Sequence, residues 1–257
     1  MTENPDAPIS HSARRYALIM ITVVYVFNFI DRQILAILLP AIKVEFSVDD
    51  WVLGFLAGPA FALFYVTLGI PIAALADRWN RRNLISVALT VWSAMTALSG
   101  AAGTIVQLSL ARIGVGVGEA GFVPPAHSMI ADMYPPERRS MAMGIFALGI
   151  SLGITIAYLG GGWMAQNIGW RQAFYIVGVP GLLLAILFRT TVAEPPRGMS
   201  EGKADRGERY SIPAVARFLV RRKSFIHLSL GAGLASFTAY AVLSFFPSFL
   251  ERSHGMN

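Results

Sequence analysis

The stretch that decides the fold reads Ala73-Ala74-Leu75-Ala76-Asp77-Arg78-Trp79-Asn80-Arg81-Arg82. It is a short, heavily charged turn between two apolar runs, residues 51–75 and 84–102. Each run is long enough to cross the hydrocarbon core of a bilayer as a helix, which needs about 20 residues. Because nothing else separates the two runs, the turn can be only a few residues long. The stretch therefore predicts two consecutive membrane-spanning helices joined by a charged turn.

The composition of the whole chain agrees with a membrane protein. The 257 residues are 55% hydrophobic and only 14% charged, whereas a soluble domain carries about 25% charged residues. Each apolar run is expected to be a helix, because a backbone exposed to lipid must satisfy its own hydrogen bonds. The sequence therefore predicts an all-α membrane protein with seven spans, at about residues 16–39, 51–75, 84–102, 105–133, 141–165, 173–188 and 225–250.

The basic residues predict the orientation of the spans. When successive loops are assigned to alternate sides, one side holds only Lys43, Arg171 and Arg252, and nearly all other basic residues lie on the opposite side. The positive-inside rule places that basic side, with the N-terminus, in the cytoplasm. The net charge of +6 is thus explained by topology, and no nucleic-acid partner is expected. The short loops and the lack of a lysosomal sorting tail favour a multi-pass protein of a cell inner membrane.

Four regions follow from this pattern. We expect a cytoplasmic tail at 1–15, a six-helix transmembrane bundle at 16–190, a cytoplasmic linker at 191–223, and a seventh helix at 224–257 that starts an incomplete second bundle. Within the linker, residues 211–222 carry apolar side chains at helical spacing beside basic ones. They form either an amphipathic helix on the inner leaflet or a solvated linker helix.

Four charged side chains lie inside the predicted spans: Asp31, Arg32, Arg112 and Glu119. Charge inside a membrane is costly, so such groups usually face a cavity and pair with one another. With a rise of 1.5 Å per residue, Arg112 lies roughly 10 Å, Asp31 roughly 13 Å and Glu119 roughly 18 Å from the outer ends of their helices. The charged groups could therefore occupy one column of a shared cavity.

Helical spacing refines this arrangement. Arg112 and Glu119 are seven residues apart and share one helix face, and Asn28 lies on the same stripe as Asp31. Arg32 is rotated by about 100° from Asp31, so the two need not share a partner. Two interpretations remain open. Either the charges form a structural ion pair that only locks two helices, or a carboxylate binds and releases a proton as the cavity alternates between sides.

A further pattern concerns the fifth span. Gly149, Gly153, Ala157 and Gly161 recur every four residues and form a face of small side chains. Such a face lets two helix backbones approach closely. Helix packing is therefore its expected role.

The turn at 73–82 resembles the signature loop of major facilitator transporters, roughly G-x-L-x-D-R-x-G-R-R. Ala73 and Asn80 replace glycines of that pattern, and asparagine is among the few residues that tolerate a left-handed turn. Spinster-type members of the superfamily are indicated by four segments: Asn28-Phe29-Ile30-Asp31-Arg32, residues 76–82, Arg112-Ile113-Gly114-Val115-Gly116-Val117-Gly118-Glu119-Ala120, and Glu194-Pro195-Pro196-Arg197-Gly198.

The resemblance implies the major facilitator fold: here a six-helix N-terminal bundle and the first helix of a second bundle, with a central cavity and alternating access. It implies a proton-coupling role for Asp31 and places Arg32, Arg112 and Glu119 in or near the substrate cavity, where Asn28 is a further candidate. It also implies a cytoplasmic gate formed by Asp77, Arg81 and Asp132.

The resemblance, taken with the charged residues in the spans, implies a proton-coupled secondary active transporter that handles a lipid or lipid-like amphiphile. The alternatives are a proton-coupled symporter of small organic anions, such as sugar acids or aromatic acids, clamped by Arg112 and Arg32, and a facilitative uniporter. No nucleophile-base pair or phosphate loop indicates an enzyme, and no cofactor or metal is expected. The expected partners are the substrate, protons and the lipid bilayer, and the protein is expected to act as a monomer.

Overall fold

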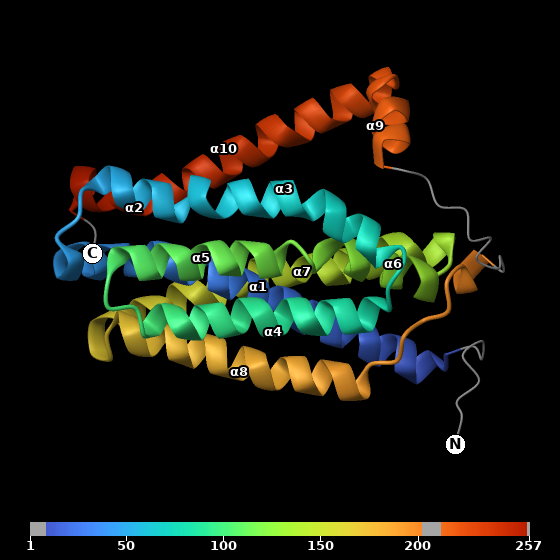
Figure 1. Cartoon of the computed structure of the whole chain (residues 1–257), viewed down its shortest axis with the longest axis horizontal. Helices are drawn as coiled ribbons and strands as arrows, with labels where there is room; N and C mark the ends of the chain where they lie inside the picture. Colours follow the sequence, from blue (N-terminus) through green and yellow to red (C-terminus); the bar gives the residue numbers. More distant parts are fainter. Residues whose placement is uncertain (1–8, 202–211, 256–257) are drawn as a thin grey trace. The chain divides into compact units, whose positions relative to one another are not determined.

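The computed structural model describes residues 9–201 and 212–255, and the chain divides into two compact units, Met1–Asp205 and Arg206–Asn257. The outer part of the predicted tail and the middle of the predicted linker, 202–211, lie outside the described residues. In the first unit the elements are α1 His11–Phe46, α2 Asp50–Ala57, α3 Pro59–Ala76, α4 Arg81–Gly100, α5 Ile105–Glu119, α6 Val123–Met133, α7 Pro136–Asn167, α8 Trp170–Thr191 and the 3-10 turn η1 Met199–Glu201. The second unit contains α9 Ile212–Val220 and α10 Lys223–His254 (Figure 1).

Seven stretches of the described residues are long and apolar enough to span a bilayer, which confirms the predicted all-α fold. Five of them lie in single helices: α1, α4, α7, α8 and residues 223–242 of α10. The other two are interrupted. Asp50–Ala76 consists of α2 and α3, and Ile105–Met133 consists of α5 and α6.

Both interruptions have a cause in the sequence. Pro59 is the first residue of α3, and Pro124 and Pro125 lie in the first turn of α6. Proline has no N–H to donate, so it fits the first turn of a helix, and each break lies just before such a turn. Pro40, Pro71 and Pro180 lie inside α1, α3 and α8, which continue past them. The break before α6 makes Glu119 the last residue of α5. A charged side chain is thus held at a helix end within the span.

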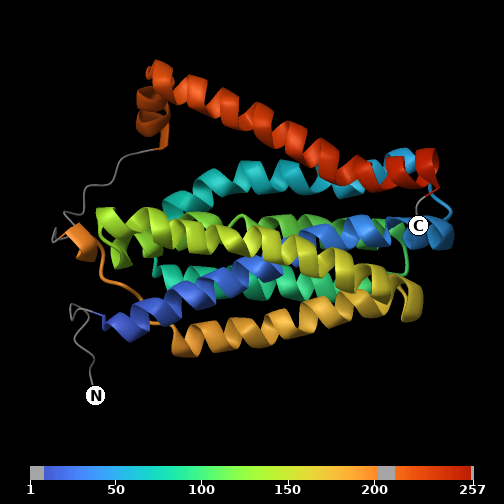
Figure 2. The same ribbon diagram turned by 180° about the vertical axis from the view of Figure 1, so that it is seen from behind.

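The small-residue face of α7 packs against α1, which runs beside it in both views (Figures 1 and 2). Gly149, Gly153, Ala157 and Gly161 are all buried. A Cβ atom added to Gly153 would lie 2.6 Å from the carbonyl oxygen of Val26, which is closer than real Cβ atoms come. The two backbones therefore touch, and the face serves helix packing.

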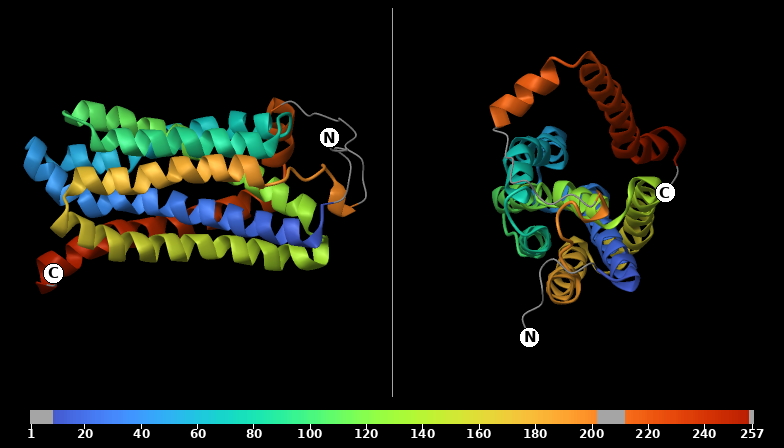
Figure 3. Two further views of the ribbon diagram at one scale, coloured as in Figure 1. Left: turned by 90° about the horizontal axis from the view of Figure 1, so that it is seen from below. Right: turned by 90° about the vertical axis from the view of Figure 1, so that its right-hand side faces the viewer.

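On the other side of the first unit, α4 packs against both α5 and α8, and the end-on view shows these helices running alongside one another (Figure 3). Gly178 of α8 allows a close approach of the two backbones, because a Cβ there would lie 2.6 Å from the backbone nitrogen of Ala97. Trp92 of α4 and Phe122 fill the core beside them. This packing fixes the rotation of α4 and α5 and hence the direction of their polar side chains.

The signature turn differs from the sequence-based expectation in one detail. Asn80 does not adopt a left-handed conformation: its φ is −66° and its ψ is 118°. It is instead the N-cap of α4, and its side-chain oxygen accepts a hydrogen bond of 2.9 Å from the backbone N–H of Asn83. Asparagine is favoured here because an N-cap oxygen satisfies one of the free N–H groups of the first turn.

Candidate functional site

The four charged side chains inside the spans form two separate ion pairs. In the first, Arg112 Nη1 of α5 donates to Asp31 Oδ1 of α1 at 2.9 Å. Arg112 Nη2 also donates to the backbone carbonyl of Asp31 at 3.3 Å, and the hydroxyl of Thr96 in α4 donates to Asp31 Oδ2. Both charged side chains are 2% exposed. Three helices therefore meet at one buried carboxylate.

The second pair joins Arg32 of α1 to Glu119 of α5, with 2.5 Å between Arg32 Nε and Glu119 Oε2. The guanidinium of Arg32 also lies over three aromatic rings, 5.4 Å from the centroid of Phe29, 5.0 Å from that of Phe61 and 4.7 Å from that of Tyr65. Such contacts stabilise a cation through the negative face of each ring. Side-chain exposure is 14% for Arg32 and 0% for Glu119.

The two pairs place all four sequence-predicted residues at one junction between α1 and α5. Asp31 and Arg32 are neighbours in the chain, yet each binds a different residue of α5, because successive side chains on a helix diverge by about 100°. Sequence reasoning missed Thr96, Phe61 and Tyr65. Thr96 lies one turn from Trp92 on the buried face of α4, but a buried threonine alone gives no signal of a carboxylate partner.

Several buried polar atoms at this junction have no hydrogen-bond partner among the described residues. They are both amide atoms of Asn28, Glu119 Oε1 and Arg112 Nε. Asn28 is fully buried and lies one helical turn from Arg32. Leaving such atoms unpaired costs about 1–3 kcal/mol each. The junction therefore has unused capacity to bind water or a polar group of a ligand.

A second cluster lies at the end of the first unit that carries the signature turn. The guanidinium of Arg81 is fully buried and donates hydrogen bonds to side-chain oxygens of Asp132, Glu194 and Ser128, and to the carbonyl of Pro195. The distances are 2.8 Å to Glu194, 2.9 Å to Ser128 and 2.6 Å to Pro195. Arg81 thus joins the turn to α6 and to the segment after α8.

Glu194 was not among the predicted gate residues, although its segment carries part of the family resemblance. Its carboxylate accepts hydrogen bonds from the backbone N–H groups of Arg81, at 3.3 Å, and Arg82, at 2.7 Å. A carboxylate at this position also matches the positive end of the helix dipole. Glu194 therefore caps α4 from a segment more than a hundred residues away.

The rest of that segment is held in the same way. Arg197 Nη2 donates to the carbonyls of Ala76 and Trp79, at 2.7 and 2.9 Å, and the backbone N–H of Gly198 donates to Asp132 at 3.0 Å. Asp77, in contrast, ends α3 in an exposed position. Its side chain forms no hydrogen bond or ion pair within residues 9–201 and 212–255. The structure thus brings Arg81 and Asp132 together but leaves Asp77 apart.

A comparison with known families matches residues 21–257 to the Major Facilitator Superfamily. The chain belongs to this superfamily. With the seven apolar spans found among the described residues, this makes it a multi-pass membrane protein. Members of the superfamily are transporters, so the comparison also supports the prediction that the chain is not an enzyme.

Relatives in the superfamily include spinster proteins, as the motifs predicted. The chain is 34% identical over 259 residues to an MFS-type efflux pump of Mycolicibacterium smegmatis and 32% identical over 248 residues to protein spinster homolog 1 of Xenopus laevis. It is 26% identical over 275 residues to a probable galactarate/D-glucarate transporter of Bacillus subtilis. These matches cover 94–96% of the chain but only 57%, 47% and 59% of the respective relatives.

A solved structure gives the same result. The crystal structure of a bacterial homolog of the human lysosomal transporter spinster, in an inward-facing and unoccupied conformation, superimposes with a TM-score of 0.79 at 38% identity. The superposition covers 97% of this chain and 58% of that one. The chain therefore spans about half the length of the relatives that it matches.

Proposed function

We propose that the chain works in a proton-coupled secondary active transporter that operates by alternating access on a lipid or lipid-like amphiphile. The observation that carries the proposal is the buried carboxylate of Asp31, held between Arg112 of α5 and Thr96 of α4. A transporter that uses a proton gradient needs a titratable group whose partners change with its charge. Asp31 has partners on two other helices, Arg112 and Thr96, and the proposal is that its protonation changes these contacts.

The physical argument concerns the cost of breaking the pair. Removing one charge of a buried ion pair leaves the other uncompensated, at a cost of about 3–5 kcal/mol. A proton bound to Asp31 would remove the negative charge that holds Arg112. Arg112 would then need another anion or water, and the connection between α1 and α5 would weaken. Protonation would thereby shift the balance between two conformations, as any ligand with different affinities for them does.

Glu119 and Asn28 are the proposed contacts for the polar part of the substrate, with Arg32 beside them. Glu119 Oε1 and both amide atoms of Asn28 are buried without partners in the described structure, so a hydroxyl or amine could bind there without displacing an existing bond. The rings of Phe61 and Tyr65, which lie next to Arg32, offer an apolar surface for the rest of the molecule. Polar and apolar surfaces side by side suit an amphiphile.

The cytoplasmic gate is proposed to have two parts. Arg81 and Asp132, with Glu194, form its fixed base, because all three are bonded within the first unit. Asp77 is exposed and is therefore available to pair with another part of the transporter when the cytoplasmic side closes. This assignment goes with the orientation set by the basic residues: a cytoplasmic N-terminus in a cell inner membrane, in a protein that acts as a monomer.

The main alternative is a proton-coupled symporter of small organic anions. The Bacillus subtilis relative named as a probable galactarate/D-glucarate transporter favours it. The geometry is less favourable, because Arg32 and Arg112 are each already paired with a carboxylate. An incoming anion would have to displace Glu119 or Asp31. A facilitative uniporter would need no titratable site at all.

Transport in proteoliposomes with an imposed pH gradient tests the proton role. We expect Asp31→Asn to abolish gradient-driven transport of a fluorescent single-chain lipid, while Asp49→Asn, at an exposed acid, leaves transport unchanged. Parallel measurements with D-glucarate distinguish the anion alternative. Full gradient-driven transport by Asp31→Asn would exclude Asp31 as the coupling site. If the unmodified protein transports the probe at the same rate with and without the pH gradient, it is a uniporter.

The substrate role of Glu119 needs two measurements on one variant. We expect Glu119→Gln to weaken binding of the transported probe in the folded protein and to leave the melting temperature nearly unchanged. If Glu119 is only the structural partner of Arg32, the variant should melt earlier and bind the probe with unchanged affinity. That second outcome would remove Glu119 from the substrate site.

A further inference from the structure

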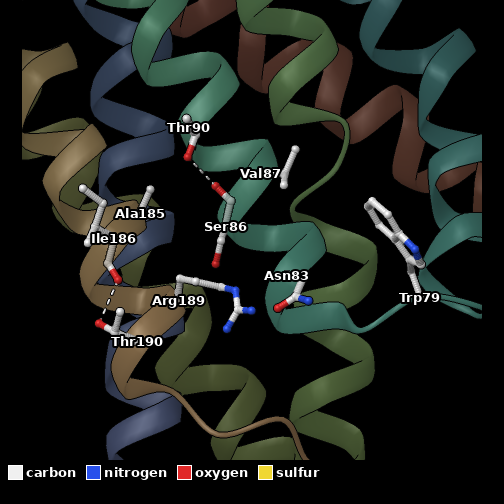
Figure 4. A pocket seen from close by; sticks show the side chains of 9 residues that line it. All are labelled: Trp79, Asn83, Ser86, Val87, Thr90, Ala185, Ile186, Arg189 and Thr190. Carbon is white, nitrogen blue, oxygen red and sulfur yellow. Dashed lines mark hydrogen bonds between the residues drawn. The ribbon is translucent and has the colours of Figure 1, made fainter.

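A groove of about 440 Å³ lies between α4 and α8 at the end of the first unit that carries the signature turn, away from the two ion pairs (Figure 4). Both walls are helices that end close by: α4 begins at Arg81, and α8 ends at Thr191. The residues that line the groove are Trp79, Asn83, Ser86, Val87, Thr90, Ala185, Ile186, Arg189 and Thr190.

The charge in the groove is positive. Arg189 is exposed in the last turn of α8 and extends toward Asn83 of α4 in Figure 4. None of the lining residues is acidic, and Arg189 forms no ion pair or hydrogen bond through its side chain within residues 9–201 and 212–255. An arginine of this kind offers a fork of N–H donors that matches a phosphate group.

The polarity of the groove changes with depth. Arg189 lies two residues from the end of α8, or about 3 Å along the helix axis, whereas Val87 and Ile186 lie roughly 8–9 Å from the ends of their helices. The deeper hydroxyls are already used, since Ser86 donates to the carbonyl of Arg82 and Thr90 donates to that of Ser86, both at 2.8 Å. The groove therefore has a charged mouth and a mainly apolar interior.

The surroundings are those of a surface that contacts lipid. Trp79 is 51% exposed at the mouth, and tryptophan is enriched where membrane and water meet. On α8, Ile176, Val179, Leu183 and Ile186 are all exposed at helical spacing. This apolar stripe continues from the groove along α8. Exposed apolar side chains of this kind are expected to contact the acyl chains of lipids.

We propose that the groove binds one anionic glycerophospholipid from the membrane leaflet at this end. Its phosphate would be bound by Arg189 and Asn83, and one acyl chain would lie along Val87 and Ile186. With the orientation proposed above, this is the cytoplasmic leaflet. The site is separate from the transport site and does not depend on the identity of the transported substrate.

Tryptophan quenching by brominated lipids tests the site on the purified protein. The signal of Trp79 is the difference between the unmodified protein and Trp79→Phe, in vesicles of phosphatidylcholine with brominated phosphatidylglycerol or brominated phosphatidylcholine as the probe. One arginine near the surface is worth about 1 kcal/mol for an anionic lipid, so we expect about a fivefold preference for phosphatidylglycerol. Arg189→Gln should remove the preference. Arg138→Gln removes the same charge from an exposed position at the start of α7 and should keep it.

Four results would overturn the proposal. If Arg189→Gln keeps the preference, Arg189 does not bind the phosphate. An equal loss in Arg138→Gln would show a general surface charge effect. Absence of quenching of Trp79 by either probe would show that protein covers the groove. Loss of the preference on adding millimolar glycerol phosphate would indicate a site for a free phosphate compound instead of a lipid.

Discussion

A double-mutant cycle on the buried pair tests whether Asp31 and Arg112 depend on each other for stability. Arg112→Met leaves the carboxylate of Asp31 in a site that is only 2% exposed, with Thr96 as its remaining side-chain partner. The free energy of unfolding should fall by about 3–5 kcal/mol, as it does for other buried ion pairs that lose one partner. Asp31→Asn leaves Arg112 unpaired and should cost a similar amount.

The double variant Asp31→Asn/Arg112→Met should recover most of this loss, because neither charge remains buried. The same cycle on Lys43 and Asp50 is the control: their atoms lie 2.5 Å apart, but the side chains are 44% and 67% exposed. Exposed pairs contribute only about 0–1 kcal/mol. Distance alone would predict a stronger coupling at the exposed pair, so the comparison isolates the effect of burial.

Melting temperatures of the purified variants in one detergent give the answer. At about 2–4 °C per kcal/mol for a chain of this size, the single variants should melt roughly 6–20 °C below the unmodified protein, and the double variant should lie well above both. If the losses of the two single variants simply add in the double variant, Asp31 and Arg112 are not energetically coupled and the reasoning fails.

Three further predictions concern the packing and the gate. Gly153→Val should prevent folding or strongly lower the melting temperature, because even a Cβ atom at Gly153 would lie 2.6 Å from the carbonyl oxygen of Val26. Gly162→Val should fold normally, because a Cβ atom there would have no neighbour within 4 Å. A thermally stable Gly153→Val would contradict the contact between α1 and α7. Glu194→Gln should lower the free energy of unfolding by about 1–2 kcal/mol, seen as a lower melting temperature, because it weakens the cap and the ion pair. Glu137→Gln, at an exposed position, should leave the melting temperature unchanged. Equal shifts in the two variants would argue against the cap. Thr96→Val should alter the pH dependence of transport without preventing folding, and an unchanged pH profile would remove Thr96 from the proton site.

The positions of the spans could be predicted because they depend on local properties. Length and hydropathy define a membrane helix, and the spacing of seven residues between Arg112 and Glu119 fixes their common face. The depth of Arg112 followed from the same arithmetic, whereas the depth of Asp31 was underestimated because α1 continues past Pro40 to Phe46. These inferences need no knowledge of which helices touch.

The pairing itself could not be read from the sequence. Whether Arg112 binds Asp31 or Glu119 depends on the rotation of α1 against α5, and that rotation is set by packing elsewhere in the first unit. The role of Glu194 was missed for a related reason: its bond to Arg81 joins residues 113 positions apart. In the sequence, a glutamate after the last helix of the bundle cannot be told from an ordinary linker charge. Only the fold shows that this segment packs against the signature turn at Arg81.

The close contact between α1 and α7 restricts how the ion pairs can exchange partners. Gly153 faces the carbonyl of Val26, and Gly149 faces that of Thr22, so a turn of α1 about its own axis would bring side chains of α1 against the backbone of α7. A turn of α1 large enough to separate Asp31 from Arg112 would therefore disrupt this packing. The two ion pairs are held on one side by a continuous helix packed closely against α7, and on the other by a helix that stops at Glu119.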